Sequence, residues 1–207
     1  MFLHYSPFWL KAFFPGFIWQ MPVNEKKIYL TFDDGPIPVV TEFVLETLDA
    51  YNAKATFFCI GDNVRKHPDI FQKVLKSGHS IGNHTYNHLN GWKTEDEIYL
   101  ENIKKCQQQL AVDTVLFRPP YGRIRRSQSR IVQESRKIIM WDVLSGDFSA
   151  ELTPEICLKK TIRHTRPGSI VLFHDSIKAS TNMQFALPAF MKHFSRLGYG
   201  FDALPMN

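Results

Sequence analysis

The stretch LTFDDGP, residues 30–36, ends an apolar run with two adjacent aspartates, Asp33 and Asp34, and continues directly into Gly35 and Pro36. Glycine and proline interrupt regular structure, so the stretch is typical of a β-strand that leads into a turn. Asp-Gly is itself a common turn signal, and this ordinary interpretation requires no chemistry. Two neighbouring carboxylates nevertheless repel each other and resist burial, so a bound cation or a catalytic role would account for the pair.

After residue 27 the chain alternates short apolar runs with amphipathic stretches, which predicts a parallel sheet with helices on its outside. The expected fold is α/β: a small, distorted barrel of seven or eight β/α units, whose sheet is either closed or left incomplete. An open doubly wound sheet is the alternative. The expected strands are KIYLTF (27–32), ATFFCI (55–60), HSIGNH (79–84), VLFR (115–118), KIIMWDV (137–143), SIVLFHD (169–175) and YGFDAL (199–204).

Helix signals lie between several of these runs. TEDE at 94–97 predicts a capping box that opens a helix toward Leu110, and Thr153 predicts an N-cap with Pro154 at the first helical position. Apolar residues at helical spacing from Val40 to Tyr51 predict a helix there, and another is expected over about 182–197. The basic cluster RIRRSQSR at 123–130 is interpreted as a solvated helix start rather than a polyanion contact.

Composition sets the class of protein but not its partner. With 207 residues and 44% hydrophobic content, the chain is expected to form one domain with one core. The net charge of +5 suits an anionic glycan and a nucleic acid equally well, and no nucleic-acid recognition motif accompanies it. The three cysteines are widely spaced, which indicates buried thiols rather than disulfides or a thiolate zinc site.

The first 27 residues differ from the rest because aromatic side chains crowd them. Lys11 interrupts the apolar stretch, Pro7 and Pro15 would break a helix, and no small-residue cleavage pattern follows. The pattern therefore indicates neither a signal peptide nor a transmembrane helix, and a cytoplasmic or membrane-peripheral location stays open. Residues 1–27 are expected to pack on a domain of residues 28–207, an interpretation favoured over membrane contact.

Polar residues gather where the expected strands end, which is where active sites form in such folds. His84 and His88 are four residues apart after the third strand, and a carboxylate from the first would complete a three-ligand site with an open position, as catalytic zinc requires. Arg118 would keep ionised the aspartate of the pair that does not bind the metal. His174 is placed to act as a general acid, and either Asp147 or Asp175 would orient it.

Together TFDDG, HTYNH, RPPYG, WDVLSGDF and LFH resemble, in order, the five motifs of the NodB-homology polysaccharide deacetylases, carbohydrate esterase family four. The resemblance runs from about Ile28 to the C-terminus. It implies the distorted barrel, a divalent metal with zinc as the usual ion, and hydrolysis of N-acetyl groups on the amino sugars of a peptidoglycan- or chitin-like glycan.

The resemblance also implies a role for each matching residue. Three would bind the metal: Asp34, His84 and His88. Five would act in catalysis: Asp33 as base, Arg118 as its holder, the Tyr121 backbone N–H as oxyanion donor, His174 as acid and Asp147 as the residue that tunes the acid. Three would line the substrate pocket: Leu172, Phe148 and Pro120.

One position departs from the family pattern. The fourth motif usually contains Asp-Trp, whereas this chain has Asp147-Phe148, which retains an aromatic ring but removes the indole N–H. The shape of the acetyl pocket is therefore open. Two alternatives remain at this point: a glycan-binding module without activity on the same fold, and a related hydrolase of cyclic imides or ureides.

Overall fold

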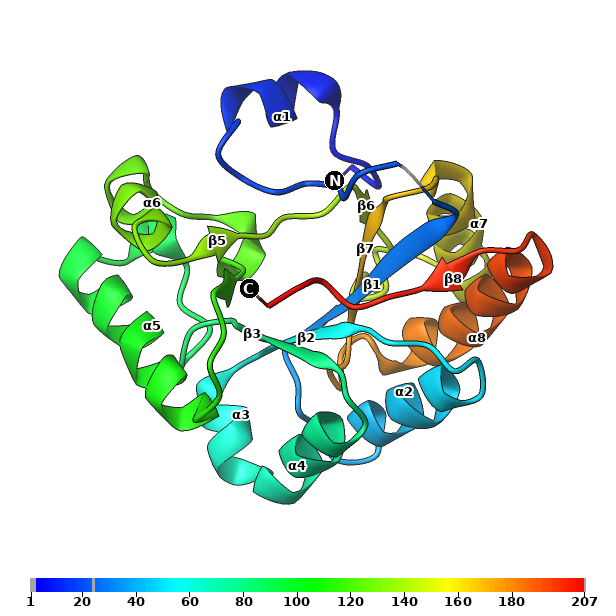
Figure 1. Ribbon diagram of the computed structural model, residues 1–207, viewed down its shortest axis with the longest axis horizontal. Coiled ribbons are helices and arrows are strands. Elements are labelled where there is room, and N and C mark those ends of the chain that lie inside the picture. The colour runs from blue at the N-terminus through cyan, green and yellow to red at the C-terminus, as the bar shows by residue number, and fades with distance from the viewer. Residues whose placement is uncertain (1–2, 24, 207) are drawn as a thin grey trace.

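The computed structural model describes residues 3–23 and 25–206, and it contains a curled parallel sheet with helices around its outer face (Figure 1). The strand order is β5-β4-β3-β2-β1-β7-β6, and β8 pairs with the start of β1. The strands are β1 Lys27–Asp33, β2 Thr56–Cys59, β3 Ser80–Asn83, β4 Leu116–Phe117, β5 Lys137–Ile138, β6 Val143–Leu144, β7 Ile170–His174 and β8 Gly200–Phe201.

The helices cover the outside of the sheet because each presents one apolar stripe to the strands. Phe32 of β1 stacks on Phe57 of β2 and Phe173 of β7, with ring centroids 5.1 and 6.2 Å apart, at the centre of the largest hydrophobic cluster. The helices are α1 Phe8–Phe13, α2 Val40–Asp49, α3 Gly61–Lys66, α4 Pro68–Lys76, α5 Asp96–Leu110, α6 Arg126–Gln133, α7 Pro154–His164 and α8 Ser180–Arg196. There are also two short 3₁₀ helices, η1 Gly91–Lys93 and η2 Pro120–Gly122.

The sheet is not closed, because its two end strands, β5 and β6, do not pair with each other. Residues of the N-terminal segment lie in this opening, and Figure 1 shows α1 between α6 and α7. We call the opening together with the chain that fills it the seam. Three isolated bridges hold it: Tyr5 to Val143, Ile18 to Ile139 and Gln20 to Ser169.

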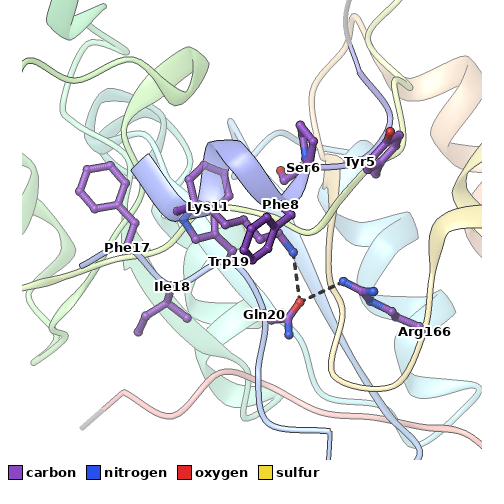
Figure 2. A pocket seen from close by; sticks show the side chains of 11 residues that line it. Tyr5, Ser6, Phe8, Lys11, Phe17, Ile18, Trp19, Gln20 and Arg166 are labelled. Atoms are coloured by element: carbon purple, nitrogen blue, oxygen red, sulfur yellow. Dashed lines mark hydrogen bonds between the residues drawn. The ribbon is translucent and has the colours of Figure 1, made fainter. Parts of the chain in front are cut away.

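A cluster of polar side chains around Asp142 fixes the seam. Asp142 is buried and accepts from Lys11, from Ser169 Oγ at 2.7 Å and from Arg166 Nη2 at 3.4 Å. Figure 2 shows Lys11 and Arg166 converging on the side-chain oxygen of Gln20, each at 3.1 Å. These contacts join the N-terminal segment to the chain that starts β7 and the chain that precedes β6.

The expected incomplete barrel is confirmed by this half-barrel, and the open doubly wound sheet is excluded because the sheet curls on itself. Two local predictions were wrong. KIIMWDV forms two short strands rather than one. Thr94 does not cap α5, whose N-cap is Glu95, because the Thr94 hydroxyl donates to the Asn90 carbonyl instead. The short helix α1 lies between Pro7 and Pro15, and neither proline is inside it, as expected of residues that interrupt helices.

Other local predictions are confirmed. Thr153 caps α7, its Oγ1 accepting from the Ile156 amide at 3.4 Å, and Pro154 begins the helix. The three cysteines are free and buried. Among the residues that the structure describes, no helix combines the length and apolarity needed to cross a membrane.

Candidate active site

The polar residues at the strand ends meet in one cavity of about 900 Å³. Asp33 at the end of β1 is the register partner of His174 at the end of β7, so the two side chains leave the sheet on the same face. His84 follows β3, and its backbone N–H donates to the β2 carbonyl of Cys59 at 3.1 Å. The parallel sheet therefore brings together residues that lie far apart in the sequence.

Asp34, His84 and His88 offer one ligand atom each, and these atoms lie within 4.8 Å of one another. Asp34 Oδ1 is 3.2 Å from His88 Nε2 and 3.8 Å from His84 Nε2. This oxygen is buried and has no hydrogen-bond partner among the described residues. A buried carboxylate oxygen without a donor is costly, and a cation between the three atoms would satisfy it. The residues present therefore fit a divalent metal.

Contacts on the far side of each imidazole orient the two histidines. His84 Nδ1 lies 2.8 Å from the Arg118 carbonyl oxygen, which as an acceptor requires the proton on Nδ1 and leaves Nε2 with its lone pair toward Asp34. His88 Nδ1 lies 3.1 Å from the Tyr121 hydroxyl. Burial lowers the pKa of His84 well below its ordinary value and also lowers that of His88. Both rings are thus neutral, the form that binds metals.

Strained backbone is concentrated at this site. Seven described non-glycine residues have positive φ, and four of them are Asp34 (83°), Thr85 (62°), His88 (57°) and Tyr121 (61°). Such conformations cost of order 1–3 kcal/mol each and persist where the surroundings enforce them, which is typical of functional sites. The backbone conformation of Asp34 is enforced through its neighbour Gly35, whose lack of a side chain leaves room for the Asp175 carboxylate. A Cβ on residue 35 would collide with that carboxylate.

Asp33 is held separately from the ligand cluster. Arg118 is fully buried and its Nη1 donates to Asp33 Oδ1 at 2.7 Å and to Thr31 Oγ1 at 2.8 Å. The remaining guanidinium nitrogens donate to the carbonyls of Ile139 and Met140. Burial lowers the pKa of Arg118 while the Asp33 carboxylate opposes this, so each charge compensates the other. A solvent-facing salt bridge, the simpler interpretation of Arg118, is excluded by this burial.

His174 and Asp147 form a second buried pair. Asp147 Oδ1 lies 2.8 Å from His174 Nδ1, and Oδ2 accepts from the His174 backbone N–H at 2.7 Å. Burial alone lowers the pKa of His174, but the Asp147 carboxylate outweighs burial, with smaller help from Asp34 and Asp33, and raises it to about 9. His174 is therefore protonated at neutral pH, and Nε2 is left to donate that proton.

Asp175, the other carboxylate considered for orienting His174, has a different contact. It accepts from the Gly35 backbone N–H at 3.0 Å and from Thr41 Oγ1 at 2.6 Å. Burial raises the pKa of Asp175 to about 8. Its position behind the DDG turn supports the conformation of Asp34, a role that no sequence signal beyond its adjacency to His174 indicated.

The walls of the cavity include residues that the sequence indicated and residues that it did not. Leu172 and Phe148 line it, and the Phe148 ring stands edge-on to His174 at 5.2 Å. Pro120 is buried and is not among the lining residues. The N-terminal segment supplies a wall that motif reasoning missed, although its aromatic composition was visible: Leu3, Tyr5, Ser6, Pro7, Leu10, Phe14, Phe17 and Trp19.

A half-barrel with an Asp-His-His cluster and two buried catalytic-type pairs at its carboxyl end defines a metal-dependent hydrolase. The sequence profile of the polysaccharide deacetylase family matches residues 20–137. The chain belongs to this family, which confirms the resemblance seen in its motifs and with it the expectation of an enzyme that acts on N-acetylated glycans. Deacetylases of the family generally depend on a divalent metal.

Two relatives and one solved structure illustrate the similarity. A peptidoglycan-N-acetylglucosamine deacetylase of Bacillus cereus is 36% identical over 188 residues, which cover 88% of either chain. A chitooligosaccharide deacetylase of Azorhizobium caulinodans is 35% identical over 158 residues, 73% of this chain and 75% of its own. A peptidoglycan N-acetylglucosamine deacetylase solved with 4-naphthalen-1-yl-N-oxidanyl-benzamide superposes with a TM-score of 0.88 at 30% identity, covering 97% of this chain and 96% of that one.

Proposed function

We propose that this protein hydrolyses the N-acetyl group of amino sugars in a peptidoglycan- or chitin-like glycan, using a divalent cation for which zinc is the first candidate. The observation that carries the proposal is the buried, unpartnered Asp34 Oδ1 between two neutral histidines, beside a second aspartate that Arg118 already holds. The two adjacent carboxylates thus have different environments, as a ligand and a base require. The names of the relatives support the substrate class.

Asp34, His84 and His88 would hold the cation through one carboxylate oxygen and two imidazole nitrogens. When bound there, the cation supplies Lewis acidity that polarises the acetamide carbonyl and lowers the pKa of water. The zinc preference follows from two imidazoles and one carboxylate, a donor set suited to a site with an open position.

Asp33 is the proposed base. Arg118 occupies Oδ1, which leaves Oδ2 facing the cavity, 3.7 Å from His84 Nε2. Oδ2 takes a proton from water as the water oxygen bonds to the acetyl carbonyl carbon. Because Arg118 is buried and fixed by four acceptors, Asp33 stays in place during this step.

His174 is the proposed acid. Its Nε2 gives a proton to the sugar nitrogen as the C–N bond breaks, so that acetate and a free amine are released. Asp147 holds Nδ1 and stabilises the charged ring before the transfer, which keeps the proton available at neutral pH. Asp147 is thus proposed to tune the pKa of His174 and also to fix the orientation of its ring.

The backbone N–H of Tyr121 is the proposed oxyanion donor. It donates no hydrogen bond within the described chain, while its neighbours Gly122 and Arg123 donate to the carbonyls of Pro119 and Pro120. The positive φ of Tyr121 turns its backbone N–H away from the hydrogen bonds that its neighbours make. Leu172 and Phe148 are proposed to contact the acetyl group, and buried Pro120 to support the Tyr121 turn.

Acetate release tests the proposal. The protein would be loaded with zinc and incubated with chitooligosaccharides and with peptidoglycan fragments, and the same reactions would be run after chelation. We expect release with metal, loss after chelation and recovery on adding zinc back. Absence of release from every N-acetylated glycan, or hydrolysis of cyclic ureides instead, would contradict the proposal.

A further inference from the structure

Helix α1 exposes three large aromatic side chains that the active site does not use. Phe8, Trp9 and Phe13 are 85%, 57% and 67% exposed. We call these three residues the aromatic knob. Single exposed apolar residues are ordinary, whereas three large exposed aromatics within one six-residue helix are a concentration of the kind that marks a binding surface.

Other residues of the segment anchor it to the domain, so the exposure of the knob is built into the fold. Leu10 and Phe14, on the opposite side of α1, pack against the hydrophobic cluster that contains Trp19. Lys11 pairs with buried Asp142, and the Gly16 carbonyl accepts from Gln133 Nε2 of α6 at 2.9 Å. A helix anchored on one face and aromatic on the other presents a fixed apolar surface.

The helices on either side of α1 carry basic side chains. The segment touches the end of α6 through the Gly16–Gln133 hydrogen bond and the end of α7 through Tyr5, whose ring stacks on His164 at 4.9 Å. Figure 1 shows α6 and α7 on either side of α1. The cations on these helices include Arg126 and Arg130 in α6 and Lys160 and Arg163 in α7.

These four cations are uncompensated. None has a carboxylate within ion-pair distance in the part of the chain that the structure describes. Two exposed carboxylates belong to these helices, Glu134 at the end of α6 and Glu155 in the first turn of α7, so the cations outnumber them. We call the four cations the basic flank.

We propose that the aromatic knob and the basic flank dock this protein on the surface of an anionic lipid bilayer. Phenylalanine and tryptophan side chains insert at the boundary between headgroups and acyl chains, and flanking lysine and arginine residues attract anionic headgroups. The charge is complementary to such a surface. It opposes a second copy of the chain, whose own basic flank would repel.

Docking would also place the active site. Leu10 and Phe14, on the side of α1 opposite the knob, line the catalytic cavity, so α1 would lie between that cavity and the bilayer. The proposal does not rest on the proposed function, because lipid binding and acetate release are measured separately.

Co-sedimentation of the full chain with vesicles tests the proposal. We expect binding to phosphatidylcholine vesicles that contain phosphatidylglycerol, and little binding to phosphatidylcholine alone. A variant with Phe8→Ser, Trp9→Ser and Phe13→Ser should bind about tenfold more weakly or worse, while its thermal midpoint and its activity on soluble oligosaccharides stay those of the parent. Ile98→Ser, at a 59% exposed position of α5, is the matched control and should bind like the parent.

Two further variants separate charge from insertion. Arg126→Glu with Arg130→Glu should weaken binding to the anionic vesicles, whereas Lys76→Glu in α4 should not. Trp9→Phe should retain binding and lose the blue shift of tryptophan emission that vesicles cause in the parent. The proposal is overturned if the parent ignores anionic vesicles, if the triple variant binds like the parent, or if the knob supports a dimer or glycan binding and no lipid binding.

Discussion

Replacing Asp147 by asparagine is expected to lower the pH at which activity is lost on the alkaline side. Both carboxylate oxygens of Asp147 face His174, one toward Nδ1 at 2.8 Å and one toward the backbone N–H at 2.7 Å. Asparagine keeps the size of the side chain and removes its charge. The proton on His174 then loses the group that stabilises it.

The structure sets the size of the effect. The pKa of His174 is raised to about 9 by Asp147 against burial, which acts in the opposite direction. Without the carboxylate, burial dominates and the pKa falls to the ordinary value of about 6.5 or below. At about pH 7.5 the protonated fraction would drop about tenfold, and at about pH 8.5 about seventyfold. The deficit of the variant thus grows as pH rises, until the parent also loses its proton above about pH 9.

Acetate release measured against pH on the zinc-loaded protein would reveal this difference. Asp113→Asn, at an exposed position away from the site, is the control and should follow the parent at every pH. An NMR titration of His174 would report the pKa directly. An alkaline limb at the same pH in parent and variant would refute the reasoning, as would a loss of activity by the same factor at every pH.

Three further predictions concern the aspartates and the ligand cluster. Asp33→Asn should retain metal and lose activity by about 10²–10⁴-fold, measured by metal content and acetate release; loss of the metal would mean that the roles of the two aspartates are exchanged. Arg118→Met leaves a buried carboxylate unpaired and should lower the free energy of unfolding in urea by about 3–5 kcal/mol, and a loss below about 1 kcal/mol would contradict the buried pair. Zinc at about 100 times its dissociation constant should stabilise the parent by about 2.7 kcal/mol and raise its thermal midpoint. His88→Ala should abolish this shift, and an unchanged shift would place the metal elsewhere.

Much of the site is readable from sequence because its geometry is local to strand ends. Asp33 and Asp34 end one apolar run, His84 ends another and His174 ends a third, and parallel strands bring their carboxyl ends to one edge. The spacing of His84 and His88 also indicates the ligand pair. The fold class follows from the same alternation of strands and helices, without knowledge of any contact.

Features that depend on contacts distant in sequence are not readable in this way. The run KIIMWDV has five apolar residues of seven and resembles one strand, yet it divides into β5 and β6 because its middle residues bond to Ile18 and to the start of β7. Thr94 matches a capping box, yet a competing acceptor, the Asn90 carbonyl, takes its hydroxyl. The six-residue helix α1 is too short to be stable alone and is fixed by tertiary packing of Leu10, which its local sequence does not indicate.

The seam has a consequence for how the molecule opens. Its backbone contacts are three isolated bridges, and its side-chain contacts centre on Asp142, whereas β1 pairs with β7 over five successive register positions. A segment held by single bridges opens at a lower free energy than a continuous strand pair, so the seam should exchange with solvent early. Amide protons of residues 18–21 should accordingly exchange with solvent through a partial opening that leaves β1 and β7 protected. The N-terminal segment would then open and close while the strand ends that carry the active site stay in place.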